Sequence, residues 1–329
     1  MTLNKILTQY FNLSDINYNS ENITPTSIYA FNLSVKSDND KNNKMREAII
    51  AGIINNKIPD EYYIINKWSK LKKNIFDFIL KLSSKPYNEI KCIHKGGRKH
   101  NYDFNIILYY EDGSDEMFNI ELKFNASSIE SAPQFVSPMK PSQYMTNSYE
   151  EYFYDKYLIL LSLVSGFEFP TKEEYLDKIH STNPNCMKEY QDLYYQGCKA
   201  SSQFQNTEDA INFYEYSKRI TEESITSFIK DNELNIELLS DYLYNSQKNK
   251  IYMLYSNNEF ILQNVNMDDY KLESVIKDNN RYKCLSKSGK SINVLLRWKN
   301  GNGIAFPAFQ IDEKETKIVI KKEKKIVIK

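Results

Sequence analysis

Apolar residues recur at helical spacing in two stretches of the first third of the chain. Residues 44–54 gather four isoleucines on one side, and residues 61–82 continue the same spacing through a longer amphipathic segment. The period then shortens into runs rich in Ile, Tyr and Phe, bounded by glycine-containing turns. This pattern is typical of strands and predicts them over 88–94, 102–110 and 115–124.

The rest of the chain changes character twice. Residues 142–153 fit a helix, and the continuous apolar run 156–164 predicts a fully buried strand, although a buried helix has the same pattern. From residue 170 the chain is polar and helical, beginning with a capping box at Thr171 and Glu174. Strand-like stretches return after residue 250. We therefore expect an α/β (α+β) protein with an N-terminal arm (1–40), a mixed core (41–169), a helical subdomain (170–249) and a β-rich C-terminal segment (250–329).

Composition narrows the functional classes. Lys and Arg together number 43, as do Asp and Glu, so the formal net charge is zero and no global positive field attracts nucleic acid. A local basic cleft is still compatible with this balance. The four cysteines show no CxxC spacing and the three histidines are scattered, so we expect no zinc site. The N-terminus is too polar for a signal peptide, and the longest apolar run falls well short of the roughly 20 residues that span a bilayer. We expect a cytoplasmic protein without membrane contact.

One constellation has the composition of a phosphodiesterase site. Asp103 is followed eighteen positions later by Glu121, Leu122 and Lys123. Two carboxylates supply the hard oxygen ligands that Mg²⁺ prefers. Glu121 and Lys123 are two apart on a predicted strand and therefore share a face. A lysine at that place can orient the attacking water and neutralise charge on the phosphate.

Glu-x-Lys alone is a weak pattern in this chain, because it also occurs at 89–91, 315–317 and 323–325. Asp77 even precedes Glu89 by twelve positions. That rival pair is unsuitable, because Asp77 lies in the middle of a predicted helix and no turn pairs it with Glu89.

The loop length of the hairpin between the second and third strands decides whether Asp103 and Glu121 lie on the same face of the sheet. If residues 111–113 form a three-residue loop with Gly113 in the left-handed conformation, Tyr110 pairs with Ser114 and Asp103 lies opposite Glu121. Their Cβ atoms are then about 5 Å apart, which suits a shared metal ion. A two-residue Asp-Gly turn would put Asp103 on the wrong face.

These residues and their order resemble the PD-(D/E)xK nuclease superfamily, and within it a type II restriction endonuclease. That resemblance implies a restriction-endonuclease-like core in which a mixed central sheet is flanked by helices, in the order helix, three meandering strands, helix, strand. It implies Asp103 and Glu121 as metal ligands, Lys123 as the catalytic lysine, and Mg²⁺, with Mn²⁺ as a substitute, as the cofactor. It also implies duplex DNA as the substrate and a homodimer as the active form. Tyr102 stands where many members have the proline of the motif.

Glu47 is a further candidate on the first helix, where many members of the superfamily have a carboxylate. At about 100° per residue it lies at the edge of the isoleucine stripe rather than opposite it. It either faces the catalytic cleft as a third carboxylate or is a surface glutamate paired with Arg46 or Lys44.

Six further residues are candidates for DNA contact. Their common feature is a basic or amide side chain in a predicted loop, and each has an ordinary structural alternative as a solvated or turn residue. They are Arg98, Lys99, Gln134, Lys140, Arg297 and Lys299. Trp298 beside Arg297 fits either base contact or a hairpin with a core tryptophan.

The leading hypothesis is a Mg²⁺-dependent endonuclease of restriction type that hydrolyses duplex DNA. A repair or recombination nuclease is the near alternative. A non-catalytic nucleic-acid-binding or protein-binding module with the same fold is the alternative from another class, and it predicts that the carboxylates of Asp103 and Glu121 do not converge.

Overall fold

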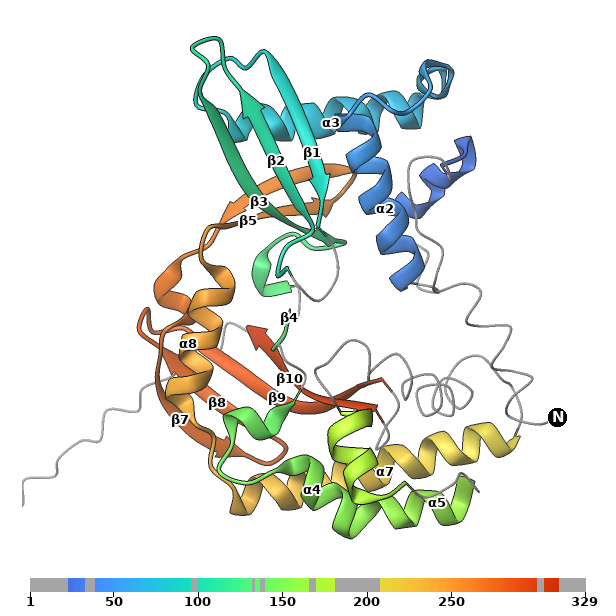
Figure 1. The fold of residues 1–329 in the computed structure, drawn as a ribbon, viewed down its shortest axis with the longest axis vertical. Helices are drawn as coiled ribbons and strands as arrows, with labels where there is room; N and C mark the ends of the chain where they lie inside the picture. Colours follow the sequence, from blue (N-terminus) through green and yellow to red (C-terminus); the bar gives the residue numbers. More distant parts are fainter. Residues whose placement is uncertain are drawn as a thin grey trace, which may run out of the picture.

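The computed structural model describes residues 23–32, 39–95, 100–131, 134–136, 140–165, 170–180, 208–300 and 305–313. Within them the chain forms two five-stranded sheets, one toward each end of the molecule (Figure 1). Sheet A has the order β1-β2-β3-β5-β6, and sheet B has the order β4-β10-β9-β8-β7. The mixed α/β architecture predicted from the sequence is confirmed. None of the helices in these ranges is both long and apolar enough to cross a membrane.

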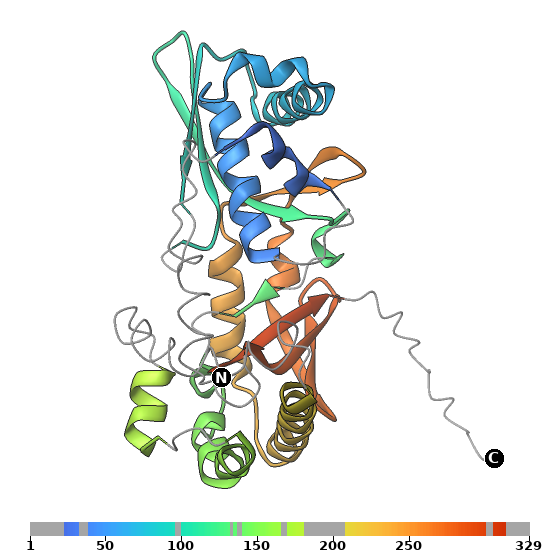
Figure 2. The same ribbon diagram turned by 90° about the vertical axis from the view of Figure 1, so that its right-hand side faces the viewer.

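Sheet A begins as an antiparallel meander of β1 (Glu89–His94), β2 (Phe104–Tyr109) and β3 (Asp115–Phe124). Strand β5 (Lys250–Ser256) then pairs with β3 in parallel, and β6 (Glu259–Asn264) completes the sheet in antiparallel fashion. Alternating apolar residues of these strands form a core with the helices α2 (Asn39–Ile54) and α3 (Asn66–Leu82), the two helices expected from the 3.6-residue period. Figure 2 shows both helices beside this sheet.

The β2–β3 hairpin has the three-residue loop and the register expected from the sequence. Tyr110 donates its backbone N–H to the carbonyl of Ser114 at 2.9 Å, and Gly113 has a φ of 79°. Phe104 pairs with Ile120, so the residue before it, Asp103, comes opposite Glu121. The alternative two-residue turn is excluded by this pairing.

The prediction of a buried strand over 156–164 is wrong. Residues Tyr154–Leu158 form a π-helical turn, and residues Ile159–Ser165 form helix α5. Leu158 and Leu161 are buried, whereas Leu163 is 76% exposed, which is the burial pattern of a helix with one face on a core. The run therefore covers a core from one side, and its uniformly apolar composition concealed the helical period.

Helix α8 (Ile236–Gln247) and strand β5 occupy the places that we expected 142–153 and 156–164 to take. The boundary expected at residue 250 consequently does not separate the two sheets, because β5 and β6 belong to sheet A. Part of the expected N-terminal arm is also ordered: Pro25–Phe31 forms a 3₁₀ helix that buries Phe31 in the core of sheet A.

Sheet B consists of β4 (Gln134–Phe135), β7 (Leu272–Asp278), β8 (Arg281–Ser286), β9 (Ser291–Asn300) and β10 (Ala305–Glu313). Its core is shared with α4 (Tyr149–Phe153), α5 and α7 (Glu208–Asp231), which lie at the end of the molecule away from α2 and α3 (Figures 1 and 2). Trp298 is buried there and donates its indole N–H to the Tyr149 hydroxyl at 3.2 Å, which confirms it as a core residue. The capping box at Thr171 is present, since its backbone N–H bonds the Glu174 carboxylate at 2.9 Å.

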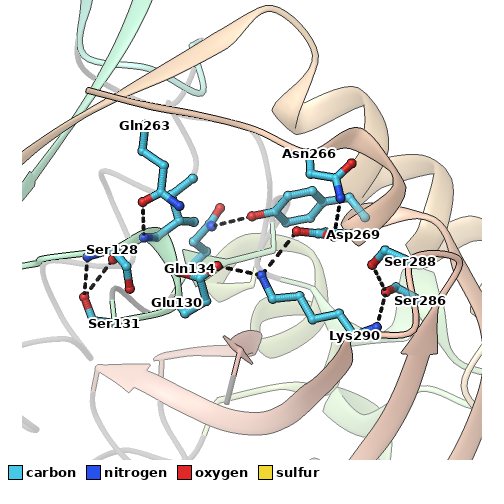
Figure 3. Close-up of polar contacts among 12 residues, drawn as sticks. Ser128, Glu130, Ser131, Gln134, Gln263, Asn266, Asp269, Ser286, Ser288 and Lys290 are labelled. Atoms are coloured by element: carbon cyan, nitrogen blue, oxygen red, sulfur yellow. Dashed lines mark hydrogen bonds and ion pairs between the residues drawn. The ribbon is translucent and has the colours of Figure 1, made fainter. Parts of the chain in front are cut away.

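A polar junction joins the two sheets (Figure 3). Lys290, in the β8–β9 turn of sheet B, donates to Glu130, which follows β3, at 2.7 Å and to Asp269 at 3.2 Å. Burial alone would raise the pKa of Glu130, but the hydrogen bonds from Lys290, from the backbone and from Ser128, with the charge of Lys290, together outweigh it and hold the pKa at about 2. Gln263 of β6 accepts from the backbone N–H of Ile129 at 2.9 Å. The segment after β3 is thus held to both halves of the molecule.

The hairpin loop gives a first prediction. Gly113→Ala should lower the free energy of unfolding by about 1 kcal/mol, because a residue with a Cβ is strained at positive φ. No atom lies within 4 Å of the position a Cβ would take, so the loss is conformational rather than steric. Urea denaturation of the purified protein measures it.

Gly113→Asn is the matched control, because asparagine tolerates the left-handed conformation and should cost less. Equal stability of the alanine variant and the wild type would contradict the conformational account of the turn.

Candidate functional site

Asp103 lies immediately before β2, at the end of the β2–β3 hairpin away from its loop. Its backbone N–H donates to the carbonyl of Ile120 at 2.9 Å, and its carboxylate accepts from the backbone N–H of Leu122 at 2.8 Å. The side chain of Asp103 is therefore hydrogen-bonded to β3, the strand that contains Glu121 and Lys123. This hydrogen bond fixes the carboxyl group against β3 and turns it toward the Glu-x-Lys segment.

Glu121 and Lys123 project from the same face of β3, as their spacing predicts. The ammonium group of Lys123 donates to one carboxylate oxygen of Glu121 at 2.6 Å. The side chain of Glu121 is 15% exposed and that of Lys123 is 23% exposed, so both are largely shielded from water. A charged hydrogen bond in such surroundings is stronger than one on an open surface, because little water competes for it.

The negative charges of two other carboxylates, Glu121 and Glu47, act on Asp103. Burial, followed by the negative charges of Glu121 and Glu47, raises the pKa of Asp103 well above its usual value. The hydrogen bond from Leu122 and the charge of Lys123 oppose this shift without cancelling it. An excess of negative charge with too few counter-charges is the electrostatic requirement of a cation site.

Glu47 of α2 belongs to this group rather than to the outer surface. Its side chain is 14% exposed, and its carboxylate contacts the ring Nε2 of His94 at 2.6 Å. The alternative in which Glu47 pairs with Arg46 is wrong, because Arg46 is buried on another side of the helix. There its guanidinium lies 3.4 Å from the centre of the Phe124 ring and donates to the carbonyl of Ala30. Arg46 therefore packs α2 against Phe124 at the end of β3, whereas the charge of Glu47 acts on Asp103.

Lys250, at the start of β5, is the residue of the group that sequence reasoning missed. Its ammonium group lies 3.8 Å from the second carboxylate oxygen of Glu121, and its side chain is only 6% exposed. It pairs with Asn119 on β3, and Asn119 in turn accepts from the buried Asn105 of β2 at 2.7 Å. Burial lowers the pKa of Lys250, and the charge of Glu121 opposes that shift. No local pattern identifies this lysine, because its neighbour in space is 129 positions away in the sequence.

The DNA-contact candidates whose side chains the structure describes, Gln134, Lys140 and Arg297, have their partners away from the carboxylates. Gln134 accepts from Gln247 at 2.8 Å. Its side-chain amide also donates to the Tyr270 hydroxyl at 3.5 Å, a contact drawn in Figure 3. Gln247 also accepts from Tyr252 at 2.7 Å, and Tyr252 is the β5 neighbour of Glu121. Gln134 is therefore a structural link between the sheets, two hydrogen bonds from the strand neighbour of Glu121.

The other candidates have separate positions. Lys140 precedes the 3₁₀ helix Pro141–Tyr144, where its charge acts on Glu150 and His180. Arg297 is exposed on β9 and donates to Gln310 at 2.7 Å. Arg98 and Lys99 lie outside the described residues, as does the side chain of Lys299.

The donor chemistry fits a magnesium ion. Within the part of the chain that the structure describes, no group of three or more His, Cys, Asp and Glu side chains forms a ready-made metal cage. Mg²⁺ does not need one, since it is usually bound by one or two carboxylates and keeps several waters. Asp103 and Glu121 provide those carboxylates. Burial and then the negative charges of Glu121 and Glu47 raise the pKa of Asp103, and a divalent cation would neutralise that charge.

Comparison with known proteins adds no relative: no family model, curated protein or solved structure matches this chain.

The burial of Asp103 beside two other carboxylates predicts that removing its charge stabilises the fold. Metal-free Asp103→Asn should be more stable than the wild type at pH 7, because the wild type holds an ionisable carboxyl whose pKa is raised by burial and by the charges of Glu121 and Glu47. The amide oxygen can still accept from Leu122. At a pH well below 3.8, the usual carboxyl pKa, Asp103 is protonated in both the folded and the unfolded wild type, and the difference should shrink. As the pH rises above that value the unfolded chain ionises first, and the folded wild type loses stability. Urea denaturation in a chelating buffer at the two pH values measures this.

Asp112→Asn on the same hairpin is the control, because the hydrogen bond from Lys85 lowers the pKa of Asp112 and its removal should not stabilise the fold. If Asp103→Asn gains nothing at pH 7, the three carboxylates do not act on one another.

Proposed function

We propose that this protein is a Mg²⁺-dependent endonuclease that hydrolyses phosphodiester bonds of duplex DNA with a PD-(D/E)xK-type site. The observation behind the proposal is the hairpin register that brings Asp103 opposite Glu121, with Lys123 bonded to Glu121. A protein that used this hairpin only as a scaffold would have no need for three half-buried carboxylates beside two lysines, because uncompensated charge is costly to bury.

The order of elements supports the same proposal. Helix α2, strands β1 to β3, helix α8 and strand β5 follow the order helix, three meandering strands, helix, strand that the resemblance implies, with α3 added between α2 and β1. The difference from our expectation is that the last helix and strand come after a long insertion. The motif residues nevertheless keep their places at the start of β2 and the end of β3.

The residues divide the chemistry in a simple way. A divalent cation held by Asp103 and Glu121 would act as a Lewis acid on the phosphate and on a water molecule. Lys123 orients the attacking water through its ammonium group and offsets charge that develops on the phosphate oxygens. Glu47 adds negative charge to the cation site and is itself held by His94.

Restriction-type activity on a two-fold DNA site is the finer form of the proposal. Cleavage of both strands is simplest when a homodimer presents two copies of one site. A net charge of zero disfavours tight non-specific binding and so suits a selective enzyme. Sheet B and its helices, which lie toward the other end of the molecule from α2 and α3, are then available for target recognition (Figure 1).

Cleavage of plasmid DNA tests the proposal. The wild type should cut in Mg²⁺ or Mn²⁺ and not in a chelating buffer. Lys123→Ala should lower the cleavage rate by at least about 100-fold, because it removes preorganised electrostatic stabilisation of the transition state. Lys91→Ala, on the exposed edge of β1, is the matched control and should cut like the wild type.

The product pattern separates the nuclease classes. Discrete fragments indicate a site-specific enzyme, whereas smearing or nicking indicates a repair or recombination role. Absence of cleavage with every divalent metal tried would refute the nuclease proposal.

Glu47→Gln should reduce cleavage strongly while DNA affinity and melting temperature stay close to wild-type values. The reason is that the amide keeps the volume of the side chain and removes only its charge from the cation site. Cleavage rates at limiting Mg²⁺ measure the effect, with Glu89→Gln on the exposed edge of β1 as the control. Wild-type activity at limiting Mg²⁺ would exclude Glu47 from the site.

A further inference from the structure

Lys250 is the one charged residue of β5 that lies against the catalytic group, and it is more buried than Lys123. Its side chain is 6% exposed, compared with 23% for Lys123. Removing an ammonium group from water is unfavourable, and a buried ion pair seldom offsets that cost in stability. A methionine or leucine would fill the same space at a lower cost, so packing alone does not account for a lysine here.

The ammonium group of Lys250 lies beside the carboxylate of Glu121. Glu121 lies between two ammonium groups, with Lys123 at 2.6 Å from one oxygen and Lys250 at 3.8 Å from the other. The charges of Asp103 and Lys123 also act on Lys250, so it belongs to the same electrostatic group. Its row in the sheet is polar, because it pairs with Asn119, which is bonded to Asn105.

The charges of the group determine how many cations it can hold. Glu47, Asp103 and Glu121 contribute three negative charges when ionised, as metal binding requires, and Lys123 and Lys250 contribute two positive ones. One divalent cation and one phosphodiester then bring the site to neutrality. A second divalent cation would leave a large positive excess in a half-buried site.

We propose that Lys250 is a positioning residue of the nuclease site, which holds Glu121 from the side opposite Lys123 and supplies the fixed positive charge that restricts the site to a single divalent cation. This inference rests on the proposed function for its cleavage arm only. Binding of the metal alone tests the rest.

Lys250→Met is the informative variant, because methionine keeps most of the volume and removes the charge. Calorimetric titration with Ca²⁺ should give one ion per chain for the wild type. The variant should bind Ca²⁺ more tightly, by about tenfold, since a like charge near the ion is gone. Its DNA cleavage rate at saturating Mg²⁺ should nevertheless fall at least about tenfold, because the phosphate charge is less well neutralised. A merely structural role would instead weaken metal binding and cleavage together.

Two further variants complete the test. Lys248→Met, an exposed lysine two positions away, should match the wild type in both assays. Lys250→Arg keeps the charge and should bind Ca²⁺ within about twofold of the wild type; it also serves if Lys250→Met does not fold.

Three results would overturn the inference: two Ca²⁺ ions per wild-type chain, unchanged or weaker Ca²⁺ binding in Lys250→Met, or tighter binding in Lys250→Arg. Absence of cleavage by the wild type would instead count against the proposed function, and the Ca²⁺ titrations would still decide the role of Lys250.

Discussion

The register of the β2–β3 hairpin is the constraint on which the rest of the site depends. Side chains alternate between the faces of a strand, so a shift of one residue would move Asp103 away from Glu121 and Lys123. The three-residue loop with Gly113 in the left-handed conformation prevents that shift. The hydrogen bond from Leu122 to the Asp103 carboxylate then fixes the aspartate at the strand end. A conformational property of one glycine is thereby converted into the position of a carboxyl group ten residues away.

Local features of this molecule could be predicted from the sequence, because their causes are local. The turn residues, the period-two strands and the Glu-x-Lys spacing all act within about twenty positions, and they led to Asp103, Glu121 and Lys123 at the correct register. The helix α2 and its edge residue Glu47 could be predicted for the same reason. The apolar run 156–164 led to the wrong element, because a stretch without polar residues has no period to distinguish a strand from a helix.

Long-range pairing is what the sequence did not disclose. Strand β5 reads as an ordinary strand at 250–255, but nothing near it indicates a parallel partner in β3 rather than a neighbour in sheet B. Lys250 was missed with it, and so was the contact between Glu47 and His94, which joins a helix to the edge of the sheet. The sequence gives the position of each charged residue, but only the tertiary fold determines which charged residues contact one another.

The separation of β3 from β5 also orders the assembly of the site in time. During synthesis the chain emerges from its N-terminus, so Asp103, Glu121 and Lys123 are made 127 to 147 positions before Lys250. Until β5 docks, Glu121 lacks its second ammonium neighbour and β3 is an unpaired sheet edge. Closing so long a loop makes the parallel pairing a late and non-local folding event. A chain interrupted before residue 250 therefore contains the whole sequence motif without the complete candidate site, and the full arrangement of its charges arises only after most of the polypeptide has been made.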